Sequence, residues 1–343
     1  MKVEKWFGAA VIAAALASSS GPAGAGQNGA PAGAVAAAHR DAPTISHALK
    51  PSKVYEGAGF VSSGVALRNR GSGIIGISGV TGPVKAGWLY WAVITSGKPT
   101  AANTSVTLGS FYPAVGATVT LTGSIVGSGE SPGWGPSAAV VSVFRAAVPA
   151  NLFAKGHGNG LFQVTLKKGA SGLTNGADPF AAGNVVLPLM EGASLVVVGK
   201  GASTVAIYDS GLAGQTFGAS LGLAYTLILP INASGSSSVL FDEIGADGQM
   251  FFNDAPNTGF STKTTAINNS AIAGPSAPDV IPDWDGLSGL PLPQLWDDTA
   301  HDVTTAAGKG GKSMNISITG GTSGGFTDAL VPVANIVAIA QAD

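Results

Sequence analysis

The chain contains 343 residues, of which 51 are glycine and none is cysteine. Only 10% of the residues are charged, and their formal net charge is −2. The hydrophobic fraction of 45% is typical of a globular protein and excludes a disordered polyelectrolyte. A nearly neutral chain offers no basic face to nucleic acid. The absence of cysteine excludes disulfides, thiolate metal sites and a cysteine nucleophile.

The N-terminus has the pattern of a secretory signal peptide. Lys2 and Lys5 precede an uncharged, mainly apolar run over 6–16, and a small-x-small cleavage site follows at 15–17. Similar sites up to residue 38 leave the cleavage position open between 17 and 38. Residues 18–53 are rich in Ala, Gly and Pro and predict a flexible leader. We therefore expect a secreted or cell-surface protein whose mature chain has no membrane-spanning segment.

The rest of the chain predicts short β-strands separated by turn residues. Val119 and Leu121 alternate with threonines, as expected for a strand with one buried face. Runs of the same kind, rich in β-branched and aromatic residues, lie at 84–95, 105–108, 117–126, 138–148, 160–167, 193–198, 204–208, 221–231, 238–244, 313–319 and 330–339. The spacing predicts an all-β protein with a jelly-roll-like antiparallel β-sandwich.

The order of strands and Gly-rich turns recurs along the chain. It predicts two related sandwich modules, at 54–215 and 216–343, which could share a core. A parallel β-helix is the alternative, since it too is rich in Gly and Asn, but we find no fixed short period.

The apolar segment 330–339 has two interpretations. It is either a strand that adds to another subunit or the last strand of its own core.

Several short motifs between residues 84 and 340 carry a family resemblance. They are Leu89-Tyr90-Trp91, Gly158-Asn159-Gly160, the strand at 191–198, Ile207-Tyr208-Asp209, Leu295-Trp296-Asp297, Asp302-Val303-Thr304 and the strand start at 330–335. This set resembles an uncharacterised family of secreted, adhesin-like surface β-sandwich repeat proteins of bacteria and archaea. The resemblance implies an extracellular β-rich surface protein and supplies no catalytic residues.

Acidic residues in the second half suggest a structural calcium site. Calcium prefers six to eight oxygen ligands, often from loop carboxylates. The candidate ligands are Asp242, Glu243, Asp247, Asp283, Asp285, Asp297 and Asp298. Their spacing matches no regular calcium loop, and a turn-forming role for the Asp residues is the alternative.

Three tryptophans in loops rich in Gly, Pro and Asp are candidates for sugar stacking: Trp134, Trp284 and Trp296. Glu130 and Glu191 form the one plausible pair of glycosidase carboxylates. The leading hypothesis is a non-enzymatic structural or adhesive protein of a cell surface or matrix, which acts by self-association or by contact with surface glycans. A carbohydrate-binding module is the alternative, and a secreted glycoside hydrolase comes third.

Overall fold

The computed structural model describes residues 47–112, 116–131, 134–136, 138–153, 158–179, 183–209, 223–248, 263–274, 277–279, 281–287, 295–319 and 330–342. The expected signal peptide and most of the expected leader lie outside these residues. Within the described chain, strands form three sheets, and the helices are limited to the 3-10 turn η1 (Ala150–Leu152) and the short α1 (Thr304–Gly308). None of these described helices is long and apolar enough to cross a membrane.

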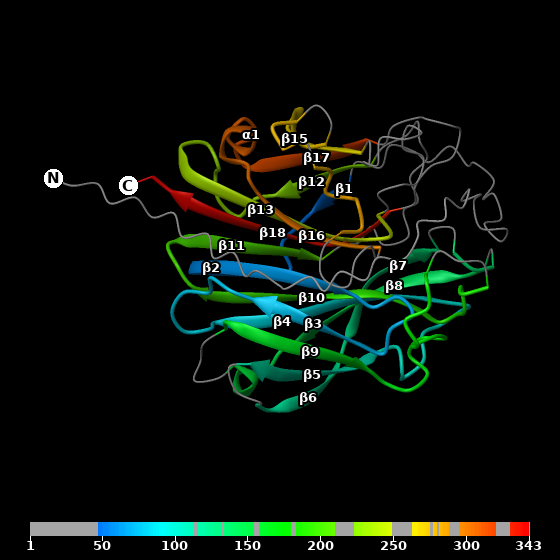
Figure 1. Cartoon of the computed structure of the whole chain (residues 1–343). Coiled ribbons are helices and arrows are strands. Elements are labelled where there is room, and N and C mark those ends of the chain that lie inside the picture. Colours follow the sequence, from blue (N-terminus) through cyan, green and yellow to red (C-terminus); the bar gives the residue numbers. More distant parts are fainter. Residues whose placement is uncertain are drawn as a thin grey trace, which may run out of the picture.

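The largest sheet has nine strands (Figure 1). In spatial order these are β16 (Trp296–Asp302), β13 (Ser236–Ala246), β18 (Val331–Gln341), β11 (Ser203–Asp209), β2 (Lys53–Ala66), β10 (Leu189–Lys200), β4 (Ala86–Thr95), β8 (Val140–Ala147) and β7 (Ser124–Glu130). The sheet curls, so that its edge strand β16 lies against β2 and β10. One face of the sheet therefore encloses a core to which both halves contribute, including Val196, Ile207 and Ile336.

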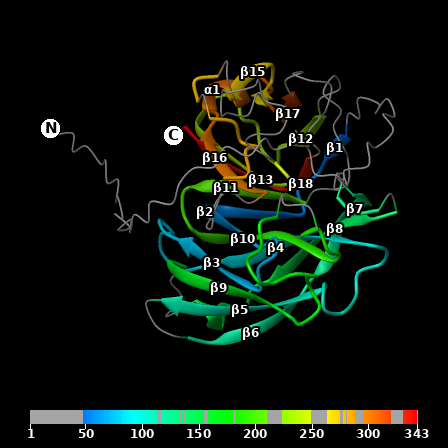
Figure 2. The ribbon, with the colours of Figure 1, turned by 45° about the vertical axis from the view of Figure 1, so that its right-hand side comes forward.

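Two smaller sheets cover the other face of the large sheet. The four-stranded sheet consists of β3 (Ser72–Ile77), β9 (Gly160–Leu166), β5 (Ser105–Tyr112) and β6 (Thr118–Thr122). The five-stranded sheet consists of β1 (His47–Leu49), β12 (Leu223–Ile228), β17 (Ser313–Thr319), β14 (Thr264–Ile267) and β15 (Ser270–Ala273). The two small sheets lie at opposite ends of the molecule, and each buries a hydrophobic core against the large sheet (Figure 2).

The prediction of an all-β sandwich is confirmed. All strand pairings in the described chain are antiparallel except that of β1 with β12, so the pairing is not that of a parallel β-helix. The strand β11 from the first expected module pairs with β18 from the second, and the large sheet is continuous across the expected boundary. The strand β1 falls inside the expected flexible leader, where pairing with β12 orders it.

The last described strand, β18, corrects one interpretation made from sequence. It pairs with β13 on one side and with β11 on the other, and it is buried along most of its length. A strand with both neighbours in place has no free backbone groups to offer a second chain. The apolar segment 330–339 is therefore a central strand of the protein's own sheet.

Candidate functional site

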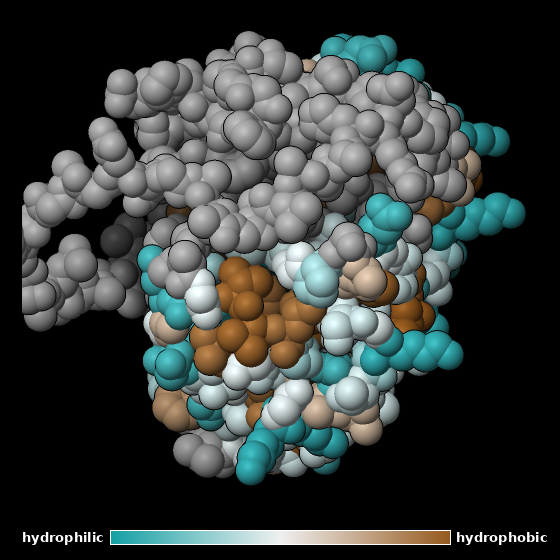
Figure 3. Space-filling view, turned by 90° about the vertical axis from the view of Figure 1, so that its right-hand side faces the viewer, coloured by the Kyte–Doolittle hydropathy of each residue, from teal (hydrophilic) through white to brown (hydrophobic). Residues whose placement is uncertain are grey.

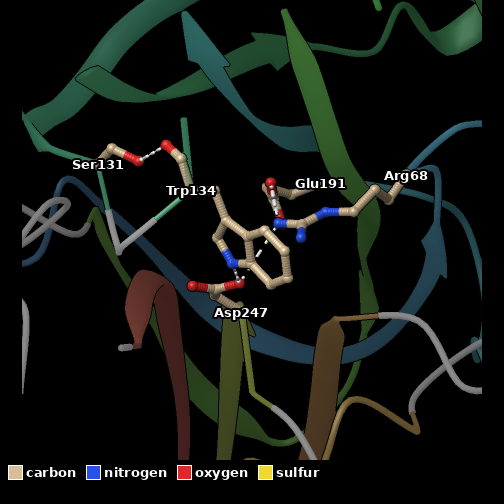
Figure 4. A network of polar contacts seen from close by, with 5 residues as sticks. All are labelled: Arg68, Ser131, Trp134, Glu191 and Asp247. Carbon is tan, nitrogen blue, oxygen red and sulfur yellow. Dashed lines mark hydrogen bonds and ion pairs between the residues drawn. The ribbon is translucent and has the colours of Figure 1, made fainter. Parts of the chain in front are cut away.

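An arginine and two carboxylates meet at one end of the enclosed core (Figure 4). Arg68 follows β2, Glu191 belongs to β10, and Asp247 follows β13; all three side chains are buried. The Nη2 atom of Arg68 lies 2.6 Å from Oε1 of Glu191 and 3.3 Å from Oδ1 of Asp247. A bulge in β10 between Met190 and Gly192 removes Glu191 from the regular pairing with β4. The group ties the two halves of the curled sheet together.

Trp134 closes this group on its outer side. Its ring lies 4.3 Å from Cζ of Arg68, and its Nε1 donates a hydrogen bond of 2.5 Å to Oδ1 of Asp247. Ser131 Oγ donates a hydrogen bond of 2.6 Å to the carbonyl oxygen of Trp134. Trp134 is half-buried. The sequence-based hypothesis expected this ring to stack on a sugar, whereas here it stacks on a guanidinium group.

A second pair of carboxylates lies on the enclosed face, between β13 and β16. Asp242 is buried, and neither of its oxygens has a hydrogen-bond partner in the described part of the chain. Asp298 is half-buried and accepts a hydrogen bond of 2.9 Å from Ser62. Burial raises the pKa of Asp298 to about 7, and burial together with the charge of Asp298 raises the pKa of Asp242 well above its usual range. Both acids therefore hold protons more readily than exposed ones.

Glu243 points to the other face of β13, toward the five-stranded sheet. It accepts hydrogen bonds from the Tyr225 hydroxyl at 2.8 Å and from Nε1 of Trp284 at 3.2 Å. Burial, followed by the charge of Asp283, raises the pKa of Glu243 to about 8. Nε2 of His301 lies 2.5 Å from Oδ1 of Asp283. Burial lowers the pKa of His301, but this contact outweighs it, so the pKa lies above its ordinary value.

The remaining expected calcium ligands, Asp285 and Asp297, shape a loop. Oδ1 of Asp297 accepts hydrogen bonds from the backbone N–H groups of Asp285 and Gly286, at 3.2 and 2.8 Å. Oδ1 of Asp285 accepts from the backbone N–H of Leu287 at 2.9 Å. The contact of Asp285 is that of a turn-forming residue, whereas Asp297 holds the backbone at 285–286 from strand β16. Burial is the main cause of the raised pKa values of both carboxyl groups.

The structure thus brings the seven candidate calcium ligands into one region but divides them among separate contacts. Asp247 lies with Arg68, Asp242 with Asp298, Glu243 near Asp283, and Asp285 with Asp297. No three His, Cys, Asp or Glu residues of the described chain are arranged so that they could hold a metal ion. A structural calcium ion stays a prediction from the sequence.

Two of the three candidate sugar-stacking tryptophans lie inside the protein. Trp284 and Trp296 are fully buried. Trp296 packs against Gly64 and Gly192 and donates from Nε1 to Ser194 Oγ at 3.0 Å. Loop composition suggested exposed rings, but the neighbouring glycines leave space that the indole fills. Neither ring offers a face to a ligand from solvent.

Replacing Gly192 by alanine is expected to destabilise the protein by about 1–3 kcal/mol. The added Cβ would overlap the Trp296 ring, which is fully buried. Urea unfolding followed by circular dichroism measures the effect. Gly97→Ala is the control, because nothing lies within 4 Å of its added Cβ. Equal unfolding midpoints for the two variants would contradict this account of how Trp296 is seated.

The expected glycosidase pair is placed in two different environments. Glu130 is exposed on the edge strand β7, whereas Glu191 is buried and its charge is balanced by Arg68.

Sequence reasoning missed Arg68, Tyr225 and the pairing of His301. One signal was available for Arg68: in a chain with so few charges, an arginine directly after the apolar run 65–67 indicates a buried charge that needs a partner.

Comparisons with known proteins leave the family open. No protein-family model matches the chain, and no curated protein matches it. The solved structures that resemble it include a recombinant peptide:N-glycanase F (PNGase F), with 12% identity, a TM-score of 0.26, and coverage of 84% of this chain and 97% of that one. A structure of Sulfolobus Turreted Icosahedral Virus has 8% identity and a TM-score of 0.23, with 84% and 90% covered. The ANXUR2 extracellular domain from Arabidopsis thaliana has 9% identity and a TM-score of 0.21, with 83% of each chain covered. These scores are too low to support any inference about function.

Proposed function

We propose that the protein is a non-enzymatic structural or adhesive component of a cell surface or extracellular matrix, and that it acts through contacts of its β-sheets. The single observation that carries this proposal is the distribution of acidic and basic side chains, which lie in the buried region but not on the strands of one outer sheet. The buried region described above contains closely placed ionisable side chains. The four-stranded sheet, by contrast, contains no Asp, Glu, Lys, Arg or His on any of its four strands.

An uncharged, exposed sheet is a surface suited to contact. Charged side chains on sheet surfaces and edges normally prevent unwanted association. The edge strand β6 has the sequence TVTLT, which has neither a charge nor a proline to block pairing. Large apolar side chains are exposed at Ile74 and Leu161 on the outer face of the same sheet. Apolar side chains also gather in a patch on the face of the molecule drawn in Figure 3.

The expected export signal supports placing this contact outside the cell. Lys2, Lys5 and the apolar run over 6–16 have the order of a secretory signal peptide. A protein without cysteine has to obtain its stability outside the cell from packing, because disulfides are not available to it. The three hydrophobic cores, between and within the sheets, supply that packing.

Placing a charge on the outer face of the four-stranded sheet is expected to abolish retention on the cell surface. In the test, purified full-length protein is added to washed cells and matrix of the organism that makes it, and the bound fraction is measured by immunoblot. Thr165→Glu introduces a carboxylate on the central strand β9, and we expect binding to fall at least about tenfold because contact would desolvate that charge.

Thr305→Glu is the matched control, because Thr305 is exposed on α1, at the opposite end of the molecule from the four-stranded sheet (Figure 1). The control should bind like the wild-type protein. Equal binding of Thr165→Glu and the wild-type protein would overturn the proposed function, and so would a comparable loss in both variants.

A further inference from the structure

The outer face of the four-stranded sheet carries a row of hydroxyl groups that crosses all four strands. Thr120 of β6 pairs with Thr107 of β5, Thr107 pairs with Thr165 of β9, and Thr165 pairs with Ser72 of β3. Paired residues share a face of the sheet, and neighbouring strands lie about 4.8 Å apart. All four side chains are at least partly exposed. The row is therefore an evenly spaced set of hydrogen-bond donors and acceptors.

Along the central strands β5 and β9, the side chains on the same face change from hydroxyl-bearing to amide and then to large aromatic ones. Two residues beyond the hydroxyl row, Gln163 stands opposite Gly109, and the Thr118 side chain of β6 lies against that glycine. Further on, Tyr112 pairs with Leu161. Tyr112 is 61% exposed, and its neighbour Phe111 is 51% exposed. From Thr107 to Tyr112 the path measures roughly 16 Å at the rise of a β-strand.

We infer that this face binds a neutral polysaccharide, which lies along β5 and β9 from Thr107 and Thr165 to Tyr112. The inference rests on the proposed function and names the partner of that contact surface. A sugar unit has hydroxyl groups at its rim and C–H groups on its faces. The threonines and Gln163 supply neutral hydrogen-bond partners for the rim. The exposed ring of Tyr112 supplies an aromatic surface for a sugar face.

The chemistry of the face favours a sugar over a second copy of this chain. Close packing of two such faces would bury the amide of Gln163 and the threonine hydroxyls, and burial without partners is unfavourable for polar groups. Stable interfaces between copies have apolar centres, whereas the centre of this face consists of Thr107, Gly109, Gln163 and Thr165. Among the exposed large apolar side chains, Ile74 lies beside Gln163 on the edge strand β3, and Leu161, Phe111 and Tyr112 lie at one end of the path.

The test is affinity electrophoresis of the full chain in native gels that contain one soluble polysaccharide each. Hydroxyethyl cellulose, soluble starch and galactomannan are the neutral probes. Alginate is the anionic probe, because Lys167 and Lys168 follow β9 and are exposed. We expect at least one neutral polymer to slow the protein and alginate not to slow it. Tyr112→Ala and Gln163→Ala should each weaken that retardation at least about tenfold.

Both variants change exposed side chains, and circular dichroism checks that they fold. Thr305→Ala on α1 is the control and should be slowed like the wild-type protein. The inference is overturned if no neutral polymer slows the protein, if alginate alone does, or if the folded variants are slowed as strongly as the wild type. If Thr165→Glu still abolishes surface retention in that case, the proposed function stands and only the sugar is excluded. Sedimentation velocity then shows whether a second copy is the partner.

Discussion

Replacing Arg68 by methionine is expected to destabilise the protein by about 3–5 kcal/mol. The substitution keeps much of the side-chain volume but removes the positive charge that faces Glu191 and Asp247. Both carboxylates are buried, so water cannot replace the lost partner. Trp134 also loses the guanidinium group on which its ring stacks. Urea unfolding followed by circular dichroism measures the change in the free energy of unfolding.

Two further variants show whether the unpaired charge is the cause. The double variant Arg68→Met with Glu191→Gln should recover part of the lost stability, because a neutral amide replaces the isolated carboxylate. Arg145→Met breaks a similar ion pair with Asp209, but those side chains are 18% and 19% exposed, so we expect a loss below about 1.5 kcal/mol. If Arg68→Met costs no more than Arg145→Met, the account of Arg68 as a tie between the two halves of the sheet is wrong.

The stability of the protein is expected to fall as the pH rises from about 5 to 8, and Glu243→Gln should flatten this dependence. The pKa of Glu243 is raised to about 8 in the folded chain, from 4.5 in an unperturbed one. Between these values the folded state holds a proton that the unfolded state releases, so each rise in pH favours unfolding. The effect is complete above the folded-state pKa, and its upper bound is about 5 kcal/mol.

Hydrogen-bond geometry supports a protonated Glu243. The single hydroxyl proton of Tyr225 faces two acceptors, Oε1 of Glu243 at 2.8 Å and Oδ1 of Asn335 at 2.9 Å. A proton on Glu243 resolves the conflict, since the carboxyl group then donates to Tyr225 and Tyr225 donates to Asn335. A glutamine at 243 can donate in the same way without titrating.

Unfolding free energies measured between pH 5 and 9 test this prediction. Asp298, with a pKa of about 7, contributes in the same direction, and so do Asp242, Asp297 and His301, whose pKa values are also raised. The glutamine variant should therefore keep a slope of the same sign that is shallower than that of the wild type. Glu130→Gln on the exposed strand β7 is the control and should follow the wild-type curve. Parallel curves for Glu243→Gln and the wild type would refute the raised pKa.

The local sequence pattern predicted those strands in which apolar and polar residues alternate. The run at 313–319 agrees with β17 at both ends, because Met314, Ile316 and Ile318 alternate with polar residues. β2 was missed, since its glycines and serines have low strand propensity. It forms because β10 and β11 pair with it on both sides. Such support comes from distant segments and leaves no local signal.

One expected strand, at 117–126, is divided between two sheets in the structure. β6 ends at Thr122 and β7 begins at Ser124, on the other side of Gly123. A Cβ at Gly123 would overlap the Trp91 ring, so the chain crosses between the sheets at the one residue that fits there. The composition around residue 123 is uniform, and the break depends on Trp91, which lies far away in sequence.

The sequence predicted which residues belong to the candidate site but not which residues they contact. The sequence singled out the acidic residues from 242 to 298, and the structure places them in one region. It could not indicate their partners, because Ser62, Arg68 and Tyr225 come from other parts of the chain. The burial of Trp284 was missed for the same reason. Its ring packs against Gly245 of β13, which is distant in sequence.

The central place of β18 has a consequence for how the protein acquires its shape during synthesis. β11 and β13 are made earlier, but each lacks a neighbour in the large sheet until residues 331–341 have been added. Until then both strands present open edges of the kind that pair with other chains. A nascent chain would need to stay unfolded, or be held by a chaperone, until its last strand emerges. Chains that stop short of Val331 should accumulate as aggregates rather than as stable halves.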